Sequence, residues 1–78
     1  MEYIKEYNDI KSFFLDHINH RLNDFNPLYN RFEIVSSKEI DTGYLYYVIN
    51  DTYENILYEI FYDINRERLA IDYTLFTC

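Results

Sequence analysis

His17 and His20 lie three residues apart, and Asp24 follows one helical turn further along the chain. Side chains at these spacings share one face of a helix, so the three could converge on a metal ion. One helix face rarely closes a tetrahedral site alone, and the pattern is more typical of the polar flank of a surface helix. We therefore predict no metal and no cofactor.

The sequence contains no complete catalytic motif. A single glycine excludes a glycine-rich phosphate loop. Ser12, Ser36 and Ser37 lack the context of a nucleophile elbow. Cys78, the only cysteine, has no histidine fixed beside it and is a poor candidate nucleophile. We expect a protein that is not an enzyme.

Charge and aromatic content favour a protein partner. Fourteen acidic residues against seven basic ones give a net charge of −7, which repels nucleic acids and anionic membranes. Ten tyrosines and six phenylalanines supply the side chains that anchor protein interfaces. The expected partner is a basic protein, including one whose natural ligand is a nucleic acid, and we expect no direct binding to nucleic acid or membrane.

The first part of the chain has the periodicity of one long amphipathic helix over residues 2–25. Asn26 and Pro27 end it, because the residue before a proline avoids the helical region. Asn8 could instead cap a shorter helix that starts at Asp9. The apolar stripe consists of Tyr3, Tyr7, Ile10, Phe14, Ile18, Leu22 and Phe25.

The rest of the chain is rich in aromatic and β-branched residues and predicts strands. Phe32–Val35 is a short strand candidate, and residues 41–43 form the clearest turn. Tyr44–Ile49 is almost wholly apolar or aromatic and predicts a central strand buried on both faces. Leu69–Phe76 alternates in polarity and predicts another strand.

Residues 53–64 fit two periodicities. Their alternation and their tyrosine, isoleucine and phenylalanine content favour a strand, with residues 65–67 as a hairpin loop. A helix over residues 52–66, with Asp51 and Glu54 as a capping box, is the alternative. The sequence thus predicts a single small α+β domain over residues 1–78, one long N-terminal helix packed on an antiparallel sheet of about four strands. The alternative order is α-β-β-α-β.

Strand alternation indicates a candidate binding surface. If the helix covers one sheet face, alternate residues of the third strand face away from it and place carboxylates between aromatic rings. The competing interpretation is that the rings cover one another and the acids only solvate the sheet. The predicted partner-binding residues are Tyr44, Tyr46, Tyr47, Glu59, Phe61, Asp63 and Asp72.

In size, acidity and mixed helix–sheet pattern, the chain resembles phage-encoded inhibitors of host defence, such as anti-CRISPR and anti-restriction proteins. Isoleucine, asparagine and tyrosine, which have AT-rich codons, are abundant, whereas glycine, alanine and proline are nearly absent. This composition favours a low-GC bacterium or its phage as the source. The resemblance implies an inhibitor that blocks the nucleic-acid groove of a host nuclease, with acids in place of phosphates. It rests on general properties, so no functional residue is carried over from that family.

Two other functions fit the same sequence. A structural protein could form a homodimer through an exposed edge strand, either Phe32–Val35 or Leu69–Phe76. An antitoxin or immunity protein could neutralise a basic toxin. The lone cysteine and the lack of a signal-like start at residues 1–6 favour the cytoplasm, which is the host cytoplasm if the protein comes from a phage.

Overall fold

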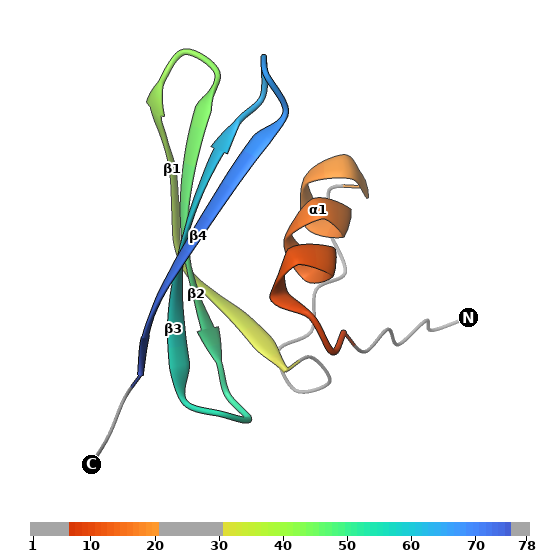
Figure 1. Ribbon diagram of the computed structural model, residues 1–78, viewed down its shortest axis with the longest axis vertical. Helices are drawn as coiled ribbons and strands as arrows, with labels where there is room; N and C mark the ends of the chain where they lie inside the picture. The colour runs from red at the N-terminus through yellow and green to blue at the C-terminus, as the bar shows by residue number, and fades with distance from the viewer. Residues whose placement is uncertain (1–6, 21–30, 76–78) are drawn as a thin grey trace.

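Four segments rich in aromatic and β-branched residues form an antiparallel meander, and one helix packs against one of its faces (Figure 1). The computed structural model describes residues 7–20 and 31–75. The predicted α+β class is confirmed. The elements are α1 (Ile10–His20), β1 (Phe32–Asp41), β2 (Tyr44–Asp51), β3 (Ile56–Asp63) and β4 (Arg68–Leu75), and the strand order is β1-β2-β3-β4.

The helix is short, and the prediction that it includes residues 7–9 is wrong. Asp9 caps it, because its carboxylate accepts a hydrogen bond from the Lys11 N–H (2.9 Å) and its carbonyl accepts one from the Phe13 N–H (3.0 Å). The alternative cap, Asn8, is one residue too early. Tyr7 packs edge-on against Phe13, and its hydroxyl donates to Asp16, so the chain folds back here. Residues 2–6 and 21–25 lie outside the described residues.

The ambiguous segment is a strand, as favoured: β3 spans Ile56–Asp63 and pairs with both β2 and β4. The turns at residues 42–43 and 64–67 are also confirmed. β1 is longer than predicted and continues to Asp41 with register shifts between Ile34 and Ser36 and between Glu39 and Asp41. Its polar second half has weak strand propensity and is held by pairing with β2, which the sequence does not reveal.

The core lies between α1 and one face of the sheet, which we call the inner face. β3 turns Tyr58, Ile60 and Tyr62 toward the helix: Ile60 is fully buried, and both tyrosines pack against the core. The prediction that β2 is buried on both faces is wrong, because among the described elements only the inner face is covered by a helix. The buried apolar residues are Tyr7, Ile10, Phe13, Phe14, Phe32, Ile49 and Ile60.

His17 lies in this aromatic core. Its ring stacks on Phe13 with the ring centroids 6.3 Å apart, and it meets Tyr47 edge-on at 5.7 Å. Its Nδ1 is buried and has no hydrogen-bond partner within residues 7–20 and 31–75. Burial lowers the pKa of His17, since the charged imidazolium loses water that the described residues do not replace.

We expect the free energy of unfolding to fall as the pH drops below about 6.5, the ordinary pKa of histidine. Below that pH the unfolded chain binds a proton on His17 that the folded protein resists, so stability present above it is lost down to the lowered folded pKa. Urea unfolding between neutral pH and pH about 5 would show the slope. His17→Phe should flatten this slope relative to the wild type. A slope unchanged in His17→Phe would contradict the assignment.

Candidate partner-binding surface

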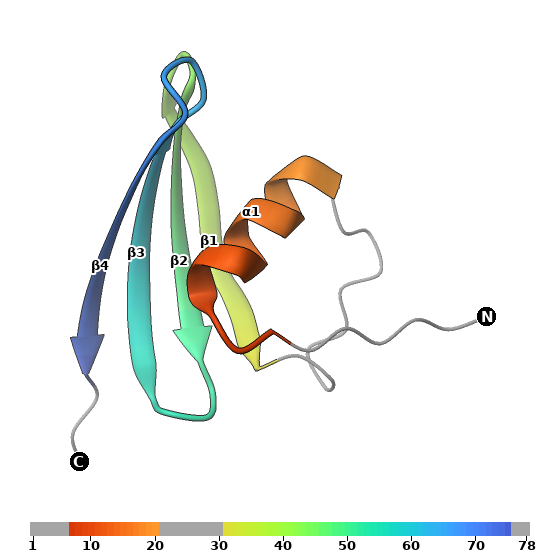
Figure 2. The same cartoon turned by 45° about the vertical axis from the view of Figure 1, so that its right-hand side comes forward.

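The face of the sheet opposite α1, which we call the outer face, is built by the register of three strands. Tyr46 on β2 lies opposite Phe61 on β3, which lies opposite Ala70 on β4. Residues directly opposite each other in antiparallel strands point to the same face, so each such row crosses the sheet. Figure 2 shows α1 on the inner side of the sheet. No described helix or strand packs on the outer face.

An aromatic cluster lies on this face. The rings of Tyr46 and Phe61 are 5.0 Å apart, and both Tyr44 and Phe61 are 42% exposed. The Tyr46 hydroxyl donates to Glu59 Oε2 at 2.7 Å, and this bond raises the pKa of Tyr46. Lys38 Nζ lies 5.4 Å from the centre of the Tyr46 ring. The cluster therefore presents apolar area beside groups that hold its rings in place.

Two carboxylates lie beside the cluster. Glu59 and Asp72 are direct cross-strand neighbours of β3 and β4, in the row next to Phe61. Like charges directly opposite each other destabilise a strand pair. The Asp72 carboxylate is exposed and accepts a hydrogen bond from the Tyr73 N–H (2.9 Å). The two acids form a concentrated negative charge that a cation would relieve.

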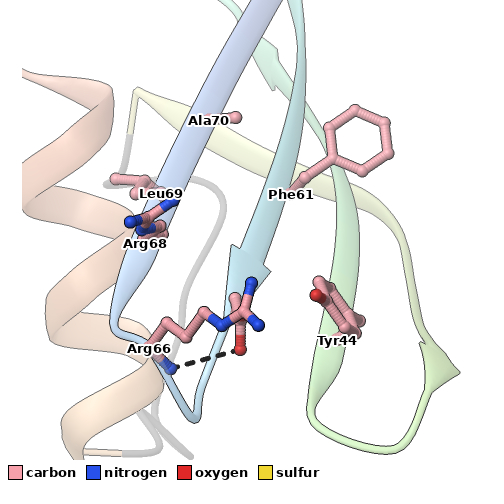
Figure 3. A pocket seen from close by; sticks show the side chains of 7 residues that line it. Tyr44, Phe61, Arg66, Arg68, Leu69 and Ala70 are labelled. Carbon is pink, nitrogen blue, oxygen red and sulfur yellow. Dashed lines mark hydrogen bonds and ion pairs between the residues drawn. The ribbon is translucent and has the colours of Figure 1, made fainter.

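A shallow, open hollow of about 360 Å³ lies at one end of the outer face. Figure 3 shows that Phe61 points away from the helix and Leu69 toward it. Two basic residues of the hollow, Arg66 and Arg68, are not among the predicted site residues. Strand alternation could have found Arg68, which shares a face with Asp72. The hollow is lined by Tyr44, Phe61, Asp63, Arg66, Arg68, Leu69 and Ala70.

Six of the seven predicted binding residues lie on the outer face, but only five of them are free for a contact there. Tyr47 lies on the inner face with its ring 5.1 Å from that of Phe14, because successive residues of a strand point to opposite sides. Asp63 is only 8% exposed, and its carboxylate accepts hydrogen bonds from Asn65 N–H (3.0 Å) and Arg66 N–H (3.2 Å) to hold the β3–β4 turn. The five that remain available on the outer face are Tyr44, Tyr46, Glu59, Phe61 and Asp72.

The histidine cluster is only partly within the described residues, since Asp24 lies outside them, as do Phe76 and Cys78. Among residues 7–20 and 31–75, no three histidine, cysteine, aspartate or glutamate side chains gather as metal ligands would. In the same two ranges, no helix has the length and apolar character required to cross a bilayer.

Comparison with known proteins found no matching family model, no matching curated protein and no matching solved structure. The function must be inferred from the surface itself.

Proposed function

We propose that this chain is a non-enzymatic protein-binding module whose outer face binds a basic protein. The observation that supports this most is the pairing of Glu59 with Asp72 directly across two strands, beside exposed Tyr44 and Phe61. An Arg or Lys from a partner would lie between the two carboxylates and remove their repulsion, and the rings would supply the apolar contact area. Within residues 7–20 and 31–75, neither acid has an ion-pair partner.

The finer proposal is that the partner binds nucleic acid and that the domain inhibits it, as a phage-encoded anti-defence protein acting in the host cytoplasm would. The net charge of −7 steers the chain toward a cationic groove. Phosphate mimicry is confined to the half of the face around Glu59 and Asp72, because Arg66 and Arg68 lie at the other end. In this arrangement the acids replace phosphates and the rings replace stacked bases.

The test uses the immobilised protein in a low-GC bacterial lysate, followed by rebinding of the purified captured protein. We expect capture of a basic nucleic-acid-binding protein that is released by added DNA duplex and by salt. Glu59→Lys should weaken the purified complex by about tenfold or more, since a buried interfacial charge is reversed.

Glu67→Lys is the matched control, because it makes the same charge change in the exposed β3–β4 turn, away from the carboxylate pair. It should leave the affinity almost unchanged. Equal affinity of wild type and a folded Glu59→Lys variant would remove the outer face as the binding surface. Capture of a basic toxin in place of a nuclease would keep the surface and replace the anti-defence role with neutralisation.

A further inference from the structure

The two edges of the sheet differ in how well they are protected against pairing with another strand. The β1 edge has two register shifts and a polar run, Ser36 to Glu39, both of which discourage edge-to-edge pairing. The β4 edge pairs with β3 in unbroken register over all eight of its residues. Along the edge that faces away from β3, β4 has backbone N–H and C=O groups that pair with no described strand.

Beside this open edge, the inner face carries three exposed apolar side chains, which we call the β4 strip. Ile71 is 36% exposed, Tyr73 61% and Leu75 57%. Figure 2 shows the reason: α1 lies across the β1–β2 side of the sheet, and β4 is at the far edge. An apolar row on an unprotected edge strand is a surface that a further strand would cover.

We propose that β4 pairs antiparallel with β4 of a second copy, which joins two four-stranded sheets into one continuous sheet. Twofold pairing keeps the two inner faces on the same side of the joined sheet only if one residue of β4 lies directly opposite the same residue of the second copy, with the symmetry axis midway between them. An axis at Asp72 would place that carboxylate against its twin. An axis at Ile71 pairs Ile71 with itself and Leu69 with Tyr73 of the second copy, so Ile71 and Tyr73 of the two β4 strips become neighbours.

Charge complementarity supports the register centred on Ile71. There Arg68 lies opposite Thr74 of the second copy and diagonal to its Asp72, a separation of about 7–8 Å that long side chains bridge. Arg68 makes no ion pair with any residue of the described ranges 7–20 and 31–75. Asp72, in turn, has only like charge opposite it within its own chain, at Glu59. The twofold axis forms this Arg68–Asp72 contact twice.

The dimer and the binding of a basic partner share Asp72, but each also needs a residue that the other does not use, and the two respond oppositely to salt. Two chains of charge −7 repel each other, so we expect salt to strengthen dimerisation, whereas it weakens binding to a cationic partner. Tyr73 lies on the inner face and Glu59 on the outer face, so Tyr73→Lys tests the dimer and Glu59→Lys tests the partner.

Sedimentation equilibrium over a wide concentration range measures the dimer. Wild type should show a concentration-dependent rise to twice the mass of the chain. Tyr73→Lys should raise the dimer Kd by about tenfold or more, because a charge enters the contact between the two β4 strips. Val35→Lys, an equally exposed apolar position on β1, should leave the Kd unchanged. A wild-type mass that stays monomeric throughout, or equal effects of the two variants, would overturn the proposal.

A charge swap tests the register. Arg68→Asp places two acids on the same diagonal, and Asp72→Arg places two arginines there, so each alone should raise the dimer Kd by about tenfold. The double variant Arg68→Asp/Asp72→Arg restores opposite charges and should recover most of the loss. Absence of recovery in a folded double variant would exclude pairing centred on Ile71.

Discussion

Asp51→Ala should lower the free energy of unfolding by about 3–5 kcal/mol, one of the two largest losses we expect from a single substitution. Asp51 is fully buried and accepts hydrogen bonds from Arg31 Nε (2.8 Å) and Nη2 (2.6 Å). It also accepts bonds from the backbone N–H groups of Tyr53 (3.0 Å) and Glu54 (3.3 Å) in the β2–β3 turn. Alanine removes all four bonds and leaves the guanidinium without its bidentate partner.

Asp63→Ala is the matched comparison for this effect. Asp63 occupies the same position in the β3–β4 turn and accepts the same two backbone bonds, but its only described ion-pair partner, Arg66, is 70% exposed at 3.9 Å. We expect a loss of about 1–2 kcal/mol, that of the turn bonds alone. Urea unfolding measures both variants. Equal losses would mean that the Arg31 pair adds nothing to stability.

The pH dependence of stability separates the contribution of Asp51 from that of His17. The Arg31 hydrogen bonds hold the pKa of Asp51 below its ordinary value, so the folded protein binds this proton less readily than the unfolded chain. Stability from this pair is present above about pH 3.9 and is lost as the pH falls through the folded pKa. Asp51→Asn should remove this acid step while the His17 step near neutral pH remains.

Asp51 also shows why the third strand was ambiguous in the sequence. A side-chain carboxylate that accepts the N–H groups two and three residues ahead caps a helix, and the same geometry closes a hairpin turn. The predicted capping signal was therefore real, but it caps the turn at residues 52–55 and not a helix. The alternation of Tyr58, Ile60 and Tyr62 correctly favours a strand over a helix, because burial on one sheet face has a period of two residues.

The helix boundary and the second half of β1 could not be predicted from local pattern. Tyr7 belongs to the apolar stripe and is buried, but it reaches the core from a non-helical segment that Asp9 ends. Periodicity reports which residues are buried and not which backbone conformation carries them. β1 continues past Val35 because β2 offers it a hydrogen-bonding partner, a contact distant in sequence.

The sequence predicts that the third and fourth strands share a surface of acids and aromatic rings, but it does not predict which acids are free to bind a partner. Alternation placed Glu59, Phe61 and Asp72 together, and the register confirmed that they are neighbours. The acids that serve local structure could not be separated from those at the surface by counting charges. Asp51 and Asp63 are consumed by turns, and the difference depends on hydrogen bonds to backbone groups that a composition does not contain.

Phe14→Ala should destabilise the fold by about 3–5 kcal/mol, since it removes a large fully buried side chain and leaves a cavity. Its ring lies 5.1 Å from Tyr47 on β2 and 5.7 Å from Tyr62 on β3, so this one residue docks α1 on two strands. Thermal or urea unfolding measures the loss.

Phe61→Ala makes the same chemical change on the other side of the same sheet. Phe61 is 42% exposed and its ring lies 5.0 Å from that of Tyr46, so we expect a loss of about 1 kcal/mol or less. The contrast tests which face is the core. Equal and small losses would mean that α1 does not pack stably on the inner face, so that the tyrosines of this face would be exposed. The inner face would then compete with the outer one as the binding surface. A large difference restricts the search for a partner to the face that carries Glu59 and Asp72.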